Sequence, residues 1–323
     1  MSGAPAFAAG IDVGGTKISS ALFAVDGTMF DRDKAPLDRE GPDRAAGQVL
    51  RTIAQLEEAA GAEGGRILAA AVCVPGIVYQ KTGLVWAPNV PGWDHYPLRD
   101  RLAGDRPFRV LIESDRAAYV SGESWCGAAR GAKDVVFLAV GTGIGAGILA
   151  GGRVLRGAED ISGAVGWFAL NPAFRPEYAE LGCFEAEASG GGVGRRARRL
   201  LEAGRPSAMT ALAGGRIEDV TAETVAAAAR GGDPLAVEVM AETASYLAMG
   251  IANIVSILNP EMIVLGGGLF QSGELLLEPV RRGIGKWAQP LAARDLRVEL
   301  SRLGEDAGLY GCGKLAWDSL KGG

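Results

Sequence analysis

The sequence predicts an α/β protein of two similar domains that face each other across a cleft. Two observations support this prediction. The chain has 323 residues, more than the about 250 to 300 at which a single hydrophobic core stops growing. A glycine-rich hairpin pattern at residues 8–27 also recurs at residues 134–153, as in a chain with an internal repeat. We therefore expect each domain to present one glycine hairpin to the cleft.

The first hairpin pattern consists of an apolar strand, a polar glycine turn, a second strand and an Asp-Gly turn. Its glycine turn contains Asp12, Gly14, Gly15, Thr16 and Lys17. The glycines let backbone amides approach an anion, and the threonine and lysine add a hydroxyl and a positive charge. The aspartate is suited to hold hydrated Mg²⁺. We interpret this turn as a phosphate-binding turn that differs from the Walker pattern GxxxxGK[ST].

The second hairpin pattern has the same order of strand, glycine turn with a threonine, and strand, followed by a Gly-Gly turn and a third strand. The predicted phosphate contacts are Gly141, Thr142, Gly143 and Gly145. An isolated glycine hairpin is often only a tight turn. The pairing of two such hairpins favours a protein that holds the phosphates of a nucleotide.

A third glycine cluster ends at Gly267 and Gly268. It follows an apolar segment with helical spacing at residues 241–258, which Asn259-Pro260 should end, and a short buried strand. After two phosphate turns, this arrangement favours an adenosine pocket. The alternative is a strand that ends in a flexible loop.

Composition argues against several classes of partner. Hydrophobic residues make up 48% and charged residues 22% of the chain, as in ordinary soluble proteins. A net charge of -5 offers no basic surface for nucleic acid. The four cysteines are far apart, which gives no disulfide framework and no clustered metal site. Because no basic leader and no apolar run of about 18 residues is present, we expect a cytoplasmic protein that binds no membrane.

Three segments together resemble the ROK family of sugar kinases and sugar-responsive repressors. They are DVGGTK at 12–17, GTGIGAG at 141–147 and LNPEMIVLGGG at 258–268. The resemblance covers nearly the whole chain and implies the two-domain actin-like ATPase fold. It implies ATP and Mg²⁺ as cofactors and a small sugar or sugar-like substrate. The family often forms homodimers, but the sequence leaves the oligomeric state open.

The resemblance implies that Asp115 is the catalytic base, which accepts the proton of the attacking hydroxyl. Phosphoryl transfer needs a positioned carboxylate of this kind. Asp115 follows the apolar run 108–112 and precedes a predicted helix, so the alternative role is helix capping. The other substrate contacts implied by the resemblance are Gly76, Asn89, Ser114 and Glu185.

The sequence departs from the family pattern in two places. Ala164 and Trp167 replace the glutamate and histidine of the family's ExGH segment. Of three cysteines that would bind zinc only Cys183 remains, with Pro176 and Tyr178 at the matched positions. Because zinc needs about four nitrogen or sulfur ligands, we predict no zinc site. We expect nearby aromatic residues to stabilise this region as an apolar plug, namely Trp167, Phe168, Phe174 and Tyr178.

These departures leave the acceptor open. We predict ATP-dependent phosphorylation of a hydroxyl of a hexose or hexose-like polyol. The alternatives are an amino sugar or a carbocyclic cyclitol as the acceptor, and a non-catalytic sugar sensor. A DNA-binding repressor is disfavoured by the acidic charge and by the few residues before Asp12. We place the first domain at 1–115 plus about 306–323 and the second at 116–305.

Overall fold

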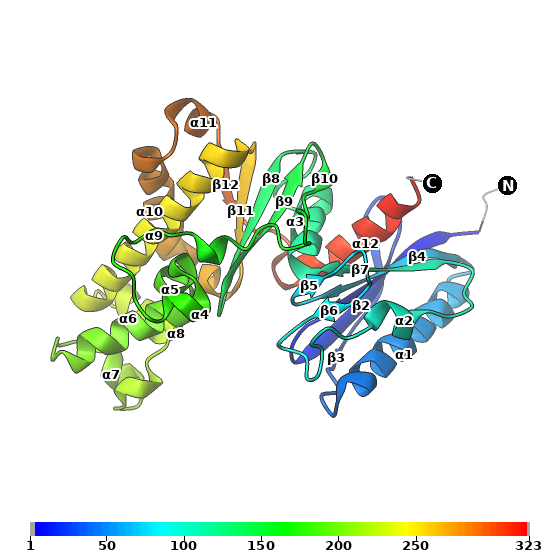
Figure 1. Ribbon diagram of the computed structural model, residues 1–323, viewed down its shortest axis with the longest axis horizontal. Coiled ribbons are helices and arrows are strands. Elements are labelled where there is room, and N and C mark those ends of the chain that lie inside the picture. The colour runs from blue at the N-terminus through cyan, green and yellow to red at the C-terminus, as the bar shows by residue number, and fades with distance from the viewer. Residues whose placement is uncertain (1–3, 322–323) are drawn as a thin grey trace. The chain divides into compact units, whose positions relative to one another are not determined.

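The structure is a computed structural model that describes residues 4–321 and divides into two compact units (Figure 1). The first unit comprises the chain up to residue 133, residues 147–162 and the chain from residue 302; the second comprises residues 134–146 and 163–301. The division predicted at residue 115 differs from this one. Helix α3 (Asp115–Cys126) packs against the last helix, α12 (Ala307–Ser319), and therefore belongs with the first unit.

The first unit is built on a five-stranded sheet with the strand order β3-β2-β1-β4-β7. Its strands are β1 (Ala6–Val13), β2 (Lys17–Phe23), β3 (Met29–Pro36), β4 (Arg66–Val74) and β7 (Arg109–Ser114). Strands β1, β2 and β3 form an antiparallel meander, whereas β1, β4 and β7 run parallel. The predicted first hairpin is therefore present as β1 and β2. A short pair, β5 (Ile77–Val78) and β6 (Val85–Trp86), follows β4.

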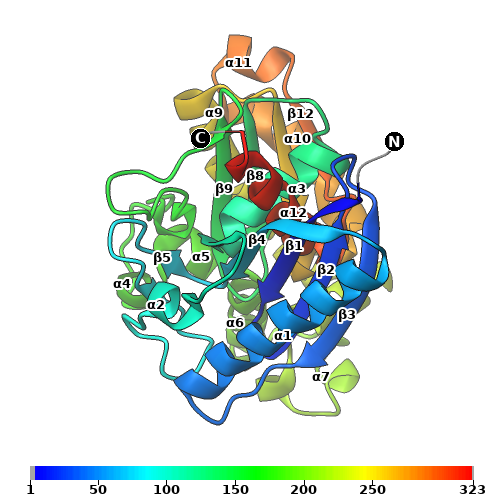
Figure 2. The ribbon, with the colours of Figure 1, turned by 90° about the vertical axis from the view of Figure 1, so that its right-hand side faces the viewer.

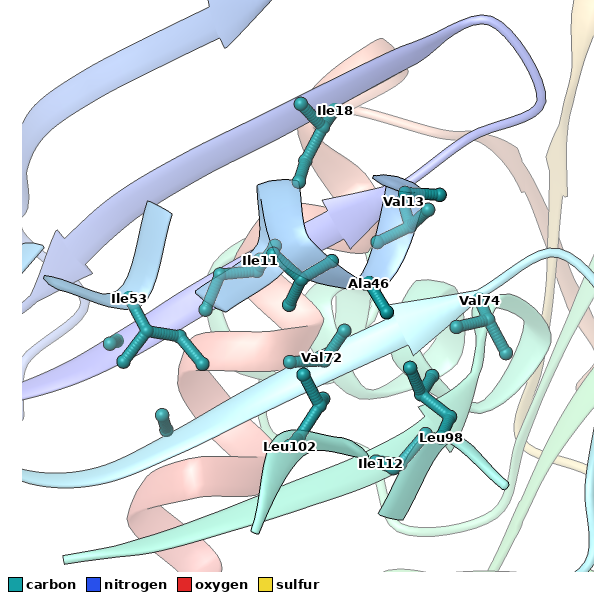
Figure 3. Packing of buried hydrophobic residues seen from close by; sticks show 14 of the residues in the cluster. Ile11, Val13, Ile18, Ala46, Ile53, Val72, Val74, Leu98, Leu102 and Ile112 are labelled. Carbon is teal, nitrogen blue, oxygen red and sulfur yellow. The ribbon is translucent and has the colours of Figure 1, made fainter. Parts of the chain in front are cut away.

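Helices cover both faces of this sheet. Alternate side chains of β1, namely Phe7, Ala9, Ile11 and Val13, enter one core cluster together with residues of α1 (Pro42–Ala62) and α2 (Leu98–Leu102). Figure 3 shows this packing, and Figure 2 shows α1 lying across β1 and β2. Helix α1 buries Val49, Ile53, Leu56 and Ala60 at helical spacing. Burial of one such Ile side chain contributes about 1.5 to 3 kcal/mol.

The opposite face of the sheet holds α3 and α12 at very close range. A Cβ atom added at Gly10 of β1 would lie 2.9 Å from the Leu309 carbonyl oxygen of α12. One added at Gly311 would lie 1.9 Å from the Ala118 carbonyl oxygen of α3. Because only glycine permits these approaches, the helix that begins with Asp115 is fixed against the sheet.

The second unit contains strands of another sheet, whose order is β10-β9-β8-β11-β12. These strands are β8 (Val135–Val140), β9 (Ile144–Ala150), β10 (Arg153–Val154), β11 (Met262–Gly266) and β12 (Arg297–Leu300). Strands β8, β11 and β12 run parallel. The chain division falls within β9, whose last residues and β10 belong with the first unit. The predicted second hairpin is present as β8 and β9.

In the chain, the helices of the second unit come after β10, and the last two of them, α10 and α11, come after β11. The helices of this unit are α4 (Tyr178–Leu181), α5 (Cys183–Ala188), α6 (Gly190–Glu202), α7 (Met209–Leu212), α8 (Ala222–Arg230), α9 (Pro234–Leu258), α10 (Gly273–Trp287) and α11 (Pro290–Arg294). Helix α9 starts at a cap in which Asp233 accepts from the Ala236 amide at 2.9 Å, and it ends at Asn259, whose φ is 44°. Its length and composition would allow it to cross a membrane, but half of its most apolar window is buried, as in a core helix.

Candidate active site

The carboxyl ends of the parallel strands of the first unit bring together the predicted catalytic base, Asp115, and the predicted Mg²⁺ ligand, Asp12. Asp12 lies near the end of β1, and its register partner on β4 is Cys73. On the next strand, β7, Ser114 is the last residue, and Asp115 follows it as the first residue of α3. Ligands of open parallel sheets bind at such edges. The first unit therefore has its functional groups where this topology favours them.

Ser114, rather than Asp115, caps helix α3. The Ser114 hydroxyl accepts a hydrogen bond from the Ala117 amide at 3.3 Å. The Asp115 carboxylate accepts from the Arg116 amide at 2.8 Å and from the Tyr119 hydroxyl at 3.4 Å. Because Ser114 supplies the cap, the capping alternative does not account for Asp115.

The environment of Asp115 suits a proton acceptor. Burial raises the pKa of Asp115 to about 6, and the nearby charge of Asp12 acts in the same direction, whereas Arg116 and Tyr119 oppose the shift. A carboxylate of this pKa is charged at neutral pH and is a stronger base than an ordinary aspartate. Enzymes tune general bases in this way.

Asp12 accepts a hydrogen bond from a thiol and packs closely against a glycine. Cys73 Sγ donates to Asp12 Oδ1 at 3.2 Å, and a Cβ atom added at Gly308 would lie 2.5 Å from Asp12 Oδ2. Burial raises the pKa of Asp12, against the effects of Cys73 and Lys17. Among residues 4–321, no three His, Cys, Asp or Glu side chains gather to hold a metal ion. A single carboxylate fits Mg²⁺, which keeps several waters and binds phosphate oxygens.

The first glycine turn is closed by a hydrogen bond from the Gly14 amide to the Lys17 carbonyl at 2.8 Å. A Cβ atom added at Gly15 would lie 3.0 Å from Cβ of Asn89, so the structure brings the predicted substrate residue Asn89 to this turn. Thr16 and Lys17 are exposed. The other predicted substrate residue of this loop, Gly76, packs so closely that an added Cβ atom would lie 2.0 Å from the Trp86 carbonyl oxygen.

Lys17 is engaged by an acid rather than free. Its Nζ atom lies 3.0 Å from Glu305, which also binds Lys34 at 2.9 Å. The bonds from Lys34 and Lys17 lower the pKa of Glu305 to about 2. A phosphate that takes up Lys17 must therefore compete with Glu305.

The second unit contains a pocket of about 700 Å³ at the tip of the second hairpin. Its lining residues are Gly141, Thr142, Gly190, Gly191, Gly194, Arg195, Arg198, Thr221, Ala222, Glu223, Arg230, Gly268, Leu269, Gln271 and Ser272. The volume lies within the about 300 to 1,000 Å³ of small-molecule pockets. The predicted residues Gly141, Thr142 and Gly268 are thus brought together.

The remaining predicted glycines lie outside this lining. Gly267 has a φ of 93°, and a Cβ atom added to it would lie 2.5 Å from the Val140 carbonyl oxygen. An atom added at Gly143 would lie 2.7 Å from a Glu185 carboxylate oxygen. Gly145 lies within β9. Steric need explains the first two glycines without any ligand contact.

Sequence reasoning missed the start of α6 as part of the pocket. Ser189 caps this helix by accepting from the Gly192 amide at 3.1 Å, and the Gly190 amide donates to the Gly141 carbonyl at 2.8 Å. A helix amino terminus binds anions through its free amides and its dipole. The serine followed by three glycines was the available signal, since this pattern is typical of a capped helix start that a ligand approaches.

Glu185 braces the second glycine turn. Its carboxylate accepts from the Ile144 amide at 2.7 Å. Burial raises the pKa of Glu185, and the hydrogen bond from the Ile144 amide and the charge of Arg195 partly oppose this shift. The structure thus gives this predicted substrate residue a contact with the phosphate turn.

The predicted aromatic plug is wrong for Trp167, which is 59% exposed. Phe174 is 73% exposed, but its ring packs edge to face on that of Tyr178, with centroids 5.9 Å apart. In the turn that contains Trp167, Val165 and Gly166 face inward, and the indole is consequently turned outward. Phe168 does pack, stacking on Phe184 with ring centroids 6.4 Å apart, and Tyr178 is buried.

The similarity of this chain to known proteins identifies its family. The family model described as ROK family matches residues 8–319. The chain belongs to the ROK family. It is 32% identical to a glucokinase of Thermotoga maritima over 97% of this chain and 98% of that protein. The predicted fold class is confirmed by its structural neighbours.

Two solved structures are similar along almost their full length. A ROK hexokinase of Thermus thermophilus has a TM-score of 0.82 and 30% identity, with 98% of this chain and 100% of that chain covered. A ROK glucokinase of Streptomyces griseus in complex with glucose and AMPPNP has a TM-score of 0.77 and 29% identity, with 97% and 99% covered.

Proposed function

We propose that this ROK-family chain is an ATP-dependent sugar kinase that phosphorylates a hydroxyl of a hexose or hexose-like polyol. The observation that carries the proposal is the placement of Asp115. It follows strand β7 beside the Asp12 edge, its pKa is raised to about 6, and Ser114 relieves it of the capping role. The similarity to glucokinases and to a glucokinase complexed with glucose and AMPPNP supports the same activity.

In the proposed reaction, Asp115 accepts the proton of the acceptor hydroxyl. The hydroxyl oxygen then attacks the terminal phosphorus of ATP while the bond to the leaving oxygen of ADP breaks. Amides of the turns at Gly14 and Gly141 and the positive charge of Lys17 bind phosphate oxygens. Mg²⁺, held through water by Asp12, would neutralise phosphate charge.

The acceptor pocket differs from the family pattern at Ala164 and Trp167. A carboxylate that bonds sugar hydroxyls contributes about 1.5 to 3 kcal/mol, so its absence changes substrate preference more than tenfold. We therefore include amino sugars and cyclitols among the candidate acceptors, with Asn89 and Glu185 as contacts. A non-catalytic sensor is disfavoured because Asp12 and Asp115 are both retained. We place the enzyme in the cytoplasm.

The proposal is tested by measuring ADP formation with a panel of hexoses, amino sugars and cyclitols. Asp115→Asn should lower acceptor-dependent turnover by about 10² to 10⁴-fold. Asp105→Asn, a change of the same chemistry at an exposed loop residue, should leave it intact. If no acceptor supports turnover, or if Asp115→Asn turns over as fast as the unmodified chain, the kinase proposal fails.

A further inference from the structure

A buried carboxylate in the second unit has three side-chain partners. Glu187 of α5 is 3% exposed. It accepts from the Tyr178 hydroxyl, from Arg175 Nη1 at 2.9 Å and from Arg196 Nη2 at 2.7 Å. The segment before α4, α4 itself, α5 and α6 therefore meet at one side chain.

Arg196 extends this network into helix α9. Arg196 is 3% exposed, and its Nη1 atom donates a hydrogen bond to Thr243 Oγ1 at 3.1 Å. Its Nε atom lies 3.3 Å from a carboxylate oxygen of Glu242, and its Cζ atom lies 5.4 Å from the centre of the Tyr246 ring. We call Arg175, Tyr178, Glu187 and Arg196 the Glu187 network.

Glu187 is held as an anion in the Glu187 network. Burial alone would raise the pKa of Glu187, but the bonds from Tyr178 and Arg196 and the charge of Arg175 outweigh it and hold the pKa below its usual value. Burial and the bond to Glu187 raise the pKa of Tyr178. Glu187 is therefore an anion fixed between two cations, and breaking such a buried pair by removing one partner is strongly destabilising.

One member of the Glu187 network, Tyr178, lies in the segment in which the family pattern has zinc cysteines. The donors at the matched positions do not fit zinc, because Pro176 has no ligand atom and Tyr178 directs its hydroxyl to Glu187. Cys183 is the only thiol of the three. Tyr178 thus stands at one position of the lost metal site and is also a member of the network.

We propose that the Glu187 network replaces zinc as the cross-link that holds residues 175–182 to helices α5, α6 and α9. The same helices hold the second glycine turn, through Glu185 to the Ile144 amide and through the Gly190 amide to the Gly141 carbonyl. In the chain, Glu187 lies two residues after Glu185 and three residues before Gly190. It therefore fixes the wall of the pocket without a metal ion.

The first test measures the metal content and the melting temperature of the full chain. Protein purified without chelator should contain substoichiometric zinc, and a zinc chelator should leave its Tm unchanged. Stoichiometric zinc whose removal lowers the Tm would overturn the proposal.

The second test compares the Tm of a variant at a buried glutamate with the Tm of a variant at an exposed one. Glu187→Gln should lower the Tm by about 6 °C or more, because it leaves Arg196 buried without its counter-charge. The control is Glu238→Gln on α9, which breaks an exposed two-bond pair with Arg205 at 2.8 and 2.9 Å; its shift should be about 2 °C or less. Equal shifts in the two variants would contradict the proposed cross-link.

A milder variant keeps the test decisive if Glu187→Gln does not fold. Tyr178→Phe removes only the hydroxyl that replaces the metal-ligating thiol, and should lower the Tm by about 2 to 8 °C. An unchanged Tm would overturn the role of Tyr178 in the network. Neither the zinc content nor the Tm depends on the proposed kinase activity. The proposed cross-link can therefore be tested even if the kinase proposal fails.

Discussion

The carboxyl edge of the first unit and the α4–α5 region of the second unit contrast in how their polar groups are used. At the edge, Asp12 and Asp115 have raised pKa values and few bonds, which suits groups that act on a ligand. In the α4–α5 region, Glu187 has a lowered pKa and three side-chain partners, which suits a group that stabilises the fold. Burial alone does not separate these roles; the number of partners does.

The largest expected effect is at the edge that carries Asp12 and Asp115. Asp115→Asn removes the proton acceptor and should lower kcat by about 10² to 10⁴-fold, the usual contribution of a general base. The Tm should change little, because Ser114 retains the helix cap. Steady-state kinetics and thermal unfolding check both parts. A large fall in Tm with an unchanged kcat would place Asp115 with the stabilising groups.

Crowding Asp12 should have the next largest effect. Gly308→Ala puts a methyl group 2.5 Å from Asp12 Oδ2, and the carboxylate must then move. We expect kcat/KM to fall about tenfold or more, because a displacement of about 1 Å costs up to 10²-fold. Gly285→Ala on α10 is the control, since an added Cβ there meets nothing within 4 Å among the described residues. An equal loss of activity in this control would show that the effect does not come from displacement of Asp12.

The activity should also depend on pH through Asp115. Its raised pKa of about 6 means that the carboxylate is protonated, and inactive as a base, below that pH. The value of kcat/KM should therefore fall about tenfold per pH unit below 6. The profile is measured in buffers of constant ionic strength. A profile that stays level down to pH 4 would show that Asp115 is not the titrating base.

The smallest expected effect concerns the acid stability of the α4–α5 region. Because the folded-state pKa of Glu187 lies below that of the unfolded chain, its stabilisation is present above the unfolded value of about 4.3 and is lost as the pH falls through the folded value. Glu187→Gln lacks this dependence. The difference in Tm between the two proteins should thus narrow as the pH is lowered below about 4. A gap that widens on acidification would reverse the assigned sign.

Local patterns in the sequence predicted the hairpins and the strand-to-helix junction at Asp115. They also predicted the helix that ends at Asn259. Each of these features depends on neighbouring residues, whose periodicity and turn chemistry are visible along the chain. The capping residue, Ser114, was missed because two adjacent polar residues compete for that role and only the backbone decides between them.

Features that join distant residues were not predictable. The Gly190 amide meets the Gly141 carbonyl across 49 positions of sequence, and Arg196 meets Thr243 across 47. The outward orientation of Trp167 depends on which of its neighbours are buried, here Val165 and Gly166. The sequence therefore indicated that zinc ligands were absent, but it gave no sign of the Glu187 network that stands in their place.

The glycine contacts between α3 and α12 have a consequence for biosynthesis. Helix α12 comes after β12 in the chain, yet it covers β1 and β4, which are synthesised earlier. Domains generally fold as units while the chain emerges from the ribosome. The first unit cannot complete its sheet face until residues 307–319 have been synthesised. Strand β1, which carries Asp12, therefore gains its covering helix only after the second unit has all of its residues.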